Sequence, residues 1–406
     1  MKWWAALVVL ALLVSASCAW AAGLTGKRDP ETGRIRLLYI GDATNTRNPV
    51  YIYKSDPTFQ PTLIPACRDV LLNAGLSIDD IRRYMRQYMP KTYRQLVSSF
   101  DSIILSDVCV LNFRPEEIDW MERCVREEGV GLAMVGGFES FGGHNYPGWG
   151  GTPVASALPV EFEADKIAKG GSYKLAVAKP DDELMKPLPW KSAPPFSGLN
   201  IVTDKDGAQE LATAVGMTNS YPLIVQWRYG EGRTLAFTPD WTPGWGADFC
   251  QWEYYLDFAS SMAMYINRVP VPQNIALVHL NRQLFYSLQN RKALLASLFE
   301  FVDKFGARTS RLEDEVAGAE EIVKKAGETY VRQDYPEALR LLQEADHRYD
   351  QIEADALKLK DRAMMWVYIV EWLAVLGTSL VTGVLLWAVM VRRRLYREVE
   401  TTRYLA

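Results

Sequence analysis

An uncharged run of 20 residues, Trp372 to Val391, lies close to the C-terminus. At about 1.5 Å of rise per residue, a helix of this length crosses the roughly 30 Å hydrocarbon core of a bilayer. The run is followed directly by Arg392, Arg393 and Arg394, and a basic flank of this kind stays on the cytoplasmic side. We therefore expect one transmembrane helix at 372–391 and a cytoplasmic tail at 392–406. The large part of the chain before the span is expected outside the cytoplasm.

The N-terminus has the form of an export signal. Lys2 precedes the apolar run 3–14, and residues 19–21 read Ala-Trp-Ala, which is a small-x-small cleavage sequence. We predict a signal peptide at residues 1–21. Lipidation at Cys18 and an uncleaved anchor are the two alternatives.

Cysteine usage leaves the redox state open. Export permits disulfides, and four cysteines allow three pairings. The cysteines that follow the signal lie in apolar stretches without the spacing of a disulfide scaffold, so buried free thiols are an equal alternative. They are Cys67, Cys109, Cys124 and Cys250. With three histidines and no Cys-x-x-Cys, neither a metal site nor another cofactor is expected.

Strand and helix patterns alternate from residue 34 onward. Apolar runs at 35–42, 102–107 and 130–135 predict strands, and residues 61–75 and 115–129 predict helices that begin at a proline and end at a glycine. This order predicts parallel βαβ units with right-handed crossovers.

The later part of this region has a different pattern. Residues 222–229 and 233–237 are strand-like and flank a Gly-Glu-Gly turn, which predicts a hairpin. An amphipathic helix at 251–267 then closes a domain that we place at 34–268.

The region between this domain and the span is helical. Residues 269–283 start with Val-Pro-Val-Pro, which indicates a stiff linker. Residues 284–362 are polar with few helix breakers, and a turn near Asp334–Pro336 separates two apolar-striped segments. We predict an antiparallel helical hairpin or coiled-coil stalk here.

Four stretches carry a family resemblance: FDSIILSDV at 100–108, AMVGGFESFGG at 133–143, TPVASALPV at 152–160, and VQWRYGEGRTLAFTPDWTPGWG at 225–246. They resemble the class I glutamine amidotransferase-like family, and the closest likeness is to its branch in bacterial membrane and exported proteins. The resemblance covers about residues 34–268. It implies an α/β fold with a doubly wound, flavodoxin-like, mostly parallel sheet, here followed by the helical stalk and the transmembrane helix.

The resemblance also implies where catalytic residues would stand. Working members have a cysteine on the sharp turn after a central strand, and that place falls near Gly137 or Phe138 here. They have a base in a Phe-His-Pro-Glu sequence on a later strand, where this chain has Thr238 and then Asp240. Since Thr does not titrate near neutral pH, the resemblance implies a degenerate amidotransferase with no catalytic residue.

The strand ends of such a sheet still form a crevice. Aromatic and polar side chains on its rim suit a sugar or peptide ligand. The ligand-binding candidates are Asp107, Phe138, Glu139, Ser140, Phe141, His144, Thr238, Asp240 and Trp241, with Asp42, Tyr146 and Trp245 beside them. We expect the domain to bind a small molecule, or to act as a scaffold for protein partners in the membrane or periplasm. The formal net charge of −4 gives no support to a nucleic-acid partner.

Catalytic alternatives stay open beside this reading. Asp107, Asp240 or His144 would serve a hydrolase or lyase acting on a sugar-like substrate, because a related trehalose-utilisation branch shares the fold. Asp107 and Asp240 would then face each other across adjacent strand ends, with raised pKa values; the ordinary alternative is that both are solvent-exposed loop acids. Ser140 with His144, and the thiol of Cys109, are weaker nucleophile candidates. A transmembrane sensor is a third class, although the short tail holds no output domain.

Overall fold

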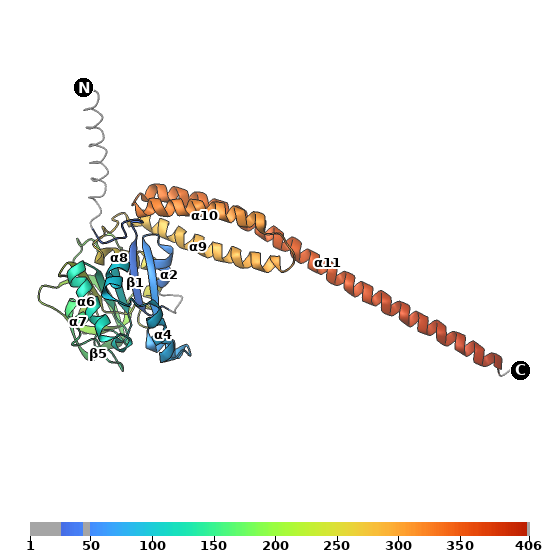
Figure 1. Cartoon of the computed structure of the whole chain (residues 1–406), viewed down its shortest axis with the longest axis horizontal. Helices are drawn as coiled ribbons and strands as arrows, with labels where there is room; N and C mark the ends of the chain where they lie inside the picture. Colours follow the sequence, from blue (N-terminus) through green and yellow to red (C-terminus); the bar gives the residue numbers. More distant parts are fainter. Residues whose placement is uncertain (1–25, 44–48, 404–406) are drawn as a thin grey trace, which may run out of the picture. The chain divides into compact units, whose positions relative to one another are not determined.

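The computed structural model describes residues 26–43 and 49–403. The predicted signal peptide at 1–21 lies outside the described residues. The chain divides into two compact units (Figure 1). The first contains the described chain up to Tyr286 together with Lys324–Leu342, and the second contains Ser287–Val323 and the described chain from Gln343 onward.

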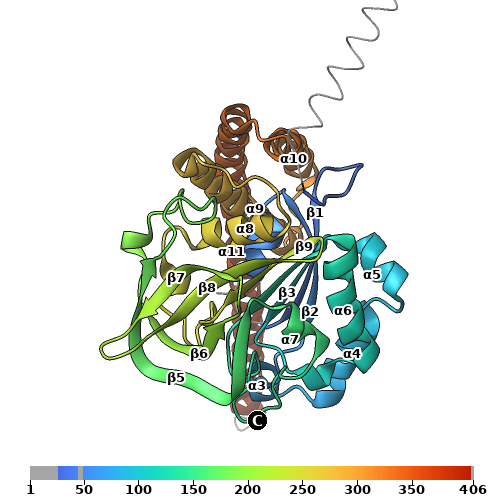
Figure 2. The same cartoon turned by 90° about the vertical axis from the view of Figure 1, so that its left-hand side faces the viewer.

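Among the described residues, the first unit is built on a nine-stranded mixed sheet (Figure 2). The strand order is β2-β1-β3-β4-β9-β8-β7-β5-β6. The strands are β1 (Ile35–Gly41), β2 (Phe59–Pro65), β3 (Ser102–Ser106), β4 (Gly131–Val135), β5 (Val160–Val177), β6 (Phe196–Asp204), β7 (Gln209–Val215), β8 (Ser220–Tyr229) and β9 (Gly232–Phe237). Neighbours from β2 to β9 are parallel, and the pairs beyond β9 are antiparallel. The predicted parallel pairings and the β8–β9 hairpin are confirmed.

Alternate residues of the parallel strands enter two separate apolar cores. On β1, Leu37 and Tyr39 belong to one core, and Leu38 and Ile40 belong to the other. This is the period of two that strand geometry imposes on a sheet covered on both faces. The first core is closed by α2 (Val50–Ser55) and α8 (Tyr255–Ile266). The second is closed by α3 (Arg68–Asn73), α4 (Ile78–Tyr88), α5 (Tyr93–Ser99), α6 (Pro115–Glu128) and α7 (Pro153–Ala157) (Figure 2).

The helix predicted at 61–75 is wrong in its first half. Residues 59–65 form β2, and only Arg68–Asn73 is helical. β2 lies at one end of the strand order and pairs with β1 alone. A proline is tolerated on such an edge strand because its missing N–H need not serve a second neighbour. Pro61 therefore marks an edge strand here, where we had taken it as the start of a helix.

The helix predicted as amphipathic at 251–267 is buried on nearly all sides. Within α8, every residue except Leu256 is buried, including Asp257 and Ser260. The chain also becomes helical again earlier than expected, because α9 (Ile275–Asp303) begins inside the segment 269–283 that we had assigned to a linker. The first turns of α9 belong to the same compact unit as the sheet.

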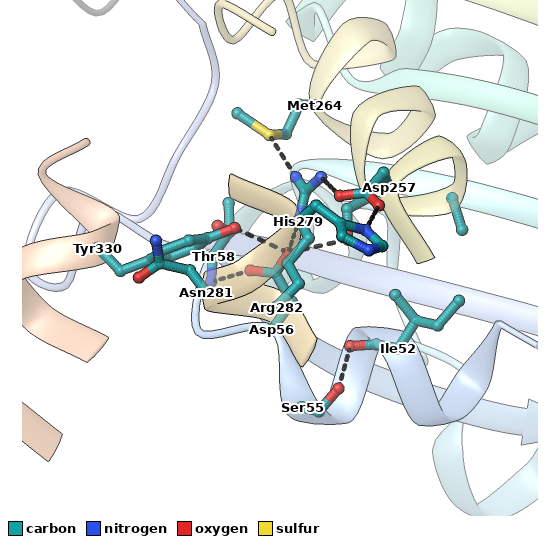
Figure 3. A network of polar contacts seen from close by, with 12 residues as sticks. Ile52, Ser55, Asp56, Thr58, Asp257, Met264, His279, Asn281, Arg282 and Tyr330 are labelled. Atoms are coloured by element: carbon teal, nitrogen blue, oxygen red, sulfur yellow. Dashed lines mark hydrogen bonds and ion pairs between the residues drawn. The ribbon is translucent and has the colours of Figure 1, made fainter. Parts of the chain in front are cut away.

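A buried polar network joins α9 to α8 and to the end of α2 (Figure 3). The Arg282 guanidinium lies 3.1 Å from Asp56 Oδ2 and 2.9 Å from Asp257 Oδ1. Asp257 also bonds the Nδ1 atom of His279 at 2.6 Å, and Tyr330 donates to Asp56 at 3.5 Å. The three charged side chains at its centre are at most 3% exposed. Asp257 and Ser260 of α8 are thus bonded inside the unit, which explains why the pattern of this helix looked like that of a solvent-facing side.

The second unit is helical. It consists of the later part of α9, the first part of α10 (Ser310–Val331) and most of α11 (Tyr335–Arg403). The turn predicted near Asp334–Pro336 separates α10 from α11 and is confirmed. In the second unit, Arg291 of α9 bonds three carboxylates of α11, and the distances to Asp346, Asp350 and Glu353 lie between 2.5 and 2.6 Å.

The uncharged run at 372–391 lies in the middle of α11. Over the described residues, one helix is long and apolar enough to cross a membrane, and its apolar window is not buried against the rest of the chain. The large apolar side chains of this window are exposed, as Leu380 at 69% and Trp387 at 63% illustrate. Exposed apolar surface of this extent is what a lipid-facing helix requires.

Candidate functional site

The carboxyl ends of β1, β3, β4 and β9 lie next to one another, because these strands are parallel neighbours in register. Backbone bonds hold the loops together just beyond the strands: the N–H of Asp42 donates to Ser106 at 3.0 Å, and that of Gly136 donates to Phe237 at 2.8 Å. Four carboxyl side chains follow these ends, and none is more than 6% exposed. We call them the strand-end carboxyls: Asp42, Asp107, Glu139 and Asp240.

Asp107, Glu139 and Cys67 make direct contacts. The backbone N–H of Glu139 donates to Asp107 Oδ1 at 2.7 Å. The Cys67 thiol lies 3.4 Å from Asp107 Oδ2 and 3.5 Å from Glu139 Oε1. Glu139 Oε1 also accepts the N–H of Asp69 at 2.7 Å, whereas Glu139 Oε2 is buried without a hydrogen-bond partner among the described residues. Asp107 itself has a φ of 47°, a strained backbone for a residue other than glycine.

Burial dominates the protonation state of this group. Burial raises the pKa of Asp107 well above its ordinary value, and the nearby charges of Asp240 and Glu139 raise it further. Burial also raises the pKa of Glu139 to about 7 and that of the Cys67 thiol well above its usual range. At neutral pH the thiol is therefore protonated, and the carboxyls beside it retain protons that exposed carboxyls would have lost.

These shifts predict a pH-dependent stability. A carboxyl whose pKa is higher in the folded state binds more protons there, so stability falls as pH rises between its unfolded and folded pKa values. For Glu139 this window runs from about 4 to about 7 and is worth roughly 3 kcal/mol. Urea unfolding at pH 5 and at pH 8 covers most of this window. The wild type should lose stability between the two pH values, and Glu139→Gln should lose about 2.5 kcal/mol less. Replacing the exposed Glu163 by Gln is the matched control, and an equal pH response of all three proteins would contradict the assignment.

The family resemblance implied a nucleophile near Gly137 or Phe138. Phe138 carries an apolar ring, and the space beside Gly137 is already occupied. A Cβ atom at this position would lie 2.2 Å from the Asp107 carboxyl, and the φ of +148° also favours glycine. The peptide is clamped by Asn200 of β6, whose Oδ1 accepts the Gly137 N–H at 2.9 Å and whose amide nitrogen donates to the Gly137 carbonyl at 3.1 Å. The side chain of Asp107, which follows β3, thus fills the space that a side chain at Gly137 would need.

In the loop after β9, the polar side chains form hydrogen bonds mainly with nearby backbone groups. The Thr238 hydroxyl, in the place of the catalytic base, donates to the Pro222 carbonyl at 2.7 Å. Asp240 accepts the backbone N–H and the hydroxyl of Thr242, both at 2.8 Å. Burial raises the pKa of Asp240 to about 6, against the effect of the Thr242 bonds. An Asp that bonds its own loop two residues on is a turn-forming residue.

Three further candidates are structural. The Ser140 hydroxyl donates to the Val135 carbonyl at 2.6 Å. Phe141 is fully buried and packs edge-on against Phe162. Trp241 is fully buried, and its indole N–H donates to Ser106 Oγ at 2.9 Å. None of these side chains reaches the surface, so the structure does not place them on the rim of a crevice.

Phe138 and His144 are the two candidates that keep partial exposure. Their ring centroids are 5.6 Å apart, and Phe138 also packs edge-on against Trp245 at 5.1 Å. His144 Nδ1 lies 2.6 Å from Asp165 Oδ1, and its Nε2 lies 3.4 Å from Lys169 Nζ. In the described part of the chain, no hydrogen bond or ion pair joins His144 to Ser140 or to a strand-end carboxyl.

Two residues that contact this site were missed from the sequence. Cys67 follows β2 and was overlooked because that strand had been assigned to a helix. Asn200 lies on β6, on the far side of a long excursion through β5, and nothing local signals its contact with Gly137. No disulfide joins the four cysteines of the described chain. Among the described residues no group of His, Cys, Asp and Glu is arranged to hold a metal ion.

Residues 68–267 match the GATase1_like family model, whose description is "Putative glutamine amidotransferase". Residues 68–267 of the α/β domain thus have the sequence pattern of that glutamine amidotransferase-like family. The match covers β3 to β9, with the loops that follow β4 and β9, and leaves out α9 to α11. The resemblance inferred from the motifs is confirmed over residues 68–267, whereas residues 34–67 of the range predicted for it lie outside the match.

Comparison with solved structures gives partial similarities. A cytoplasmic protein of Salmonella typhimurium LT2 is 22% identical, with a TM-score of 0.44, and the match covers 57% of this chain and 100% of that one. A second cytoplasmic protein of Salmonella typhimurium is 21% identical, with a TM-score of 0.46 and coverages of 58% and 99%. A ThuA-like protein of Bacteroides uniformis is 13% identical, with a TM-score of 0.34 and coverages of 59% and 97%. No curated protein sequence matches this chain.

Proposed function

We propose that this chain is a membrane-anchored protein whose glutamine amidotransferase-like head has no amidotransferase chemistry and serves as a binding or scaffolding module in a membrane protein assembly. The observation that carries the proposal is the Asp107 carboxyl, which fills the space of a nucleophilic side chain at Gly137. Thr238, in the place of the base, is bonded to a backbone carbonyl and has no proton to exchange near neutral pH.

The chemistry of amide hydrolysis supports the same reading. A thiol attacks as a thiolate, which a nearby histidine or cationic group must stabilise. Cys67 instead contacts two carboxyl groups, and burial raises the pKa of its thiol. His144 and His279 are each bonded to an aspartate elsewhere in the first unit. Cys67 and Cys109, the thiols that follow β2 and β3, are both buried, and burial raises the pKa of each, so both are held in an unreactive form.

The strand order supports a flavodoxin-like, doubly wound description of the parallel half of the sheet. The order β2-β1-β3-β4-β9 has the form 2-1-3-4-5 of that class, with helices on both faces. Such folds bind ligands beyond the carboxyl ends of their strands. Ser140, Phe141, Thr238 and Trp241 are buried and present no side-chain surface to a ligand, which favours scaffolding over capture of a small molecule. Phe138 and His144 are the side chains through which a ligand would be bound.

The topology proposed is one membrane span, with the head outside the cytoplasm. It is supported by the uncharged run 372–391 within α11, by the arginines at 392–394, and by the signal-like sequence at 1–21. We place the head in the extracytoplasmic space and the tail after the span in the cytoplasm, with partner proteins in the membrane or periplasm.

The test is ammonia release from glutamine by the purified, detergent-solubilised chain. We expect no release above the rate in the absence of protein, and no difference between wild type and Cys67→Ser. Ammonia release that is lost in Cys67→Ser would overturn the proposal, because it would make the buried thiol a working nucleophile.

A hydrolase or lyase acting on a sugar-like substrate is the second candidate. The observation that favours it is the buried carboxyl of Asp107, whose pKa is raised well above its ordinary value, since a carboxyl that keeps its proton near neutral pH is suited to general acid catalysis. The pKa of Asp240 is raised less, to about 6. Turnover of a chromogenic glycoside that is lost in Asp240→Asn or His144→Ala, with folding unchanged, would establish this candidate. Equal absence of turnover in all three proteins is the outcome expected for a scaffold.

A further inference from the structure

A cavity of about 680 Å³ opens on the first unit where α4, the segment after it and the start of α6 meet. Its cationic lining residues come from three separate stretches of chain: Arg82 and Arg86 from α4, Lys91 from the following segment, and Arg114 from the N-cap of α6. None of the strand-end carboxyls lines it. We call it the basic cavity.

Two of the four cations are already paired. Arg114 bonds Glu117, the acidic residue of the cavity lining, at 2.9 Å. Arg82 lies 3.1 Å from Asp79, but both side chains are more than 60% exposed, and an exposed pair of this kind contributes little. Arg82 is therefore free to exchange its partner.

The other two cations have no carboxylate partner. Across the described ranges of the chain, no Asp or Glu oxygen lies within ion-pair distance of Arg86 or Lys91. The Lys91 ammonium donates to the Arg86 carbonyl, which satisfies one of its three donors. Arg86 lies near the C-terminal end of α4, where a positive charge interacts favourably with the helix dipole. The helix dipole does not explain why Lys91 and Arg114, which come from other segments, line the same cavity. The cavity therefore presents uncompensated positive charge in a chain whose formal net charge is −4.

The wall of the cavity between these cations is apolar. Met85 and Phe113 line it and are almost fully buried, while Leu111 lines it and is 59% exposed. A wall of this kind accepts an apolar side chain, and the planar guanidinium of Arg86 matches the geometry of a carboxylate. The volume is within the range of pockets that bury a ligand of several side chains.

We propose that the basic cavity binds an acidic peptide segment of a protein partner. Carboxylates of the peptide pair with Arg86 and Lys91, and a neighbouring apolar side chain packs on Leu111 and Phe113. The site is a cavity with an exposed leucine on its wall, which suits a peptide. A lipid surface would need a broad, flat cationic face. This assignment does not depend on whether the head is catalytic.

The test uses the full chain in nonionic detergent and a fluorescein-labelled peptide of alternating leucine and glutamate residues. Fluorescence anisotropy should show binding that weakens as salt rises, since exposed charge pairs are screened. The double variant Arg86→Gln, Lys91→Gln should bind about tenfold more weakly or worse. Arg83→Gln is the matched control, because Arg83 is exposed on the same helix and does not line the cavity, and it should bind as wild type does.

Three outcomes would overturn the assignment. Equal affinity for a peptide in which glutamine replaces glutamate would remove the role of charge. Unchanged binding by the double variant, with an unchanged melting curve, would place the peptide elsewhere. Displacement of the peptide by millimolar inorganic phosphate, or binding to phosphatidylglycerol vesicles without peptide binding, would make the cavity a phosphate or lipid site.

Discussion

Replacing Arg282 by Met is expected to lower the free energy of unfolding of the head by about 3–5 kcal/mol. Arg282 is 3% exposed and is the cation between the buried carboxylates of Asp56 and Asp257. Removing one partner of a buried ion pair leaves the other charge desolvated and unpaired, and that penalty exceeds the worth of the pair itself. Here two carboxylates would lose the same partner.

Thermal or urea unfolding of the detergent-solubilised chain, followed by tryptophan fluorescence, measures this loss. The matched control is Arg348→Met on α11, where the arginine is 50% exposed and pairs with Glu344 one turn away. An exposed pair one helical turn apart is worth about 0.3–0.5 kcal/mol. Similar losses for the two substitutions would mean that Arg282 is not buried between its carboxylates, and that the start of α9 is not part of the head.

The second large effect is expected at Gly137. An alanine there would place its Cβ atom 2.2 Å from the Asp107 carboxyl and would have to adopt a φ of +148°. The Asp107 carboxyl is fixed by its bond to the Glu139 N–H, so the collision is not relieved by a flexible side chain. We expect Gly137→Ala to cost about 3 kcal/mol or more, from strain and from disruption of the buried carboxyls.

Gly150→Ala provides the control in the same loop. No atom lies within 4 Å of a Cβ built at Gly150, so this substitution should change stability by less than about 0.5 kcal/mol. The measurement is the urea unfolding midpoint of each variant, compared with that of the wild type. A neutral Gly137→Ala would show that Asp107 does not occupy the space beside this glycine, and the proposal of a non-catalytic head would lose its main support.

The parallel part of the fold was predictable from local patterns. Apolar runs that end in glycine or aspartate identify β1, β3 and β4, and the Gly-Glu-Gly turn identifies the β8–β9 hairpin. The same patterns predicted that Asp107 and Asp240 follow strands that end at the same edge of the sheet. The prediction that these two strands are adjacent is wrong, because β4 lies between β3 and β9. The burial of Asp107 and Asp240 was not predicted, because the loops fold back over them through contacts with distant segments.

The missed features depend on pairings between distant segments. β2 contains two prolines, and only its place at the edge of the sheet makes them compatible with a strand. Cys67 became part of the site through that strand. Asn200 reaches Gly137 from 63 residues away, and the polar face of α8 is paired with Arg282 of another helix. A pattern of periodicity carries no information about such partners.

The central claim is that the Cys67 thiol, which contacts the carboxyls of Asp107 and Glu139, is buried, protonated and unreactive. Labelling of the folded chain with iodoacetamide at pH 7.5, read out by mass spectrometry, tests it most directly, because only the thiolate reacts. Cys250, which is partly exposed, is the internal reference. We predict that Cys67 is labelled at least about a hundred times more slowly than Cys250 in the folded protein, and as fast once the protein is unfolded. Preferential labelling of Cys67 in the folded protein would contradict the account, because that is the behaviour of an activated nucleophile.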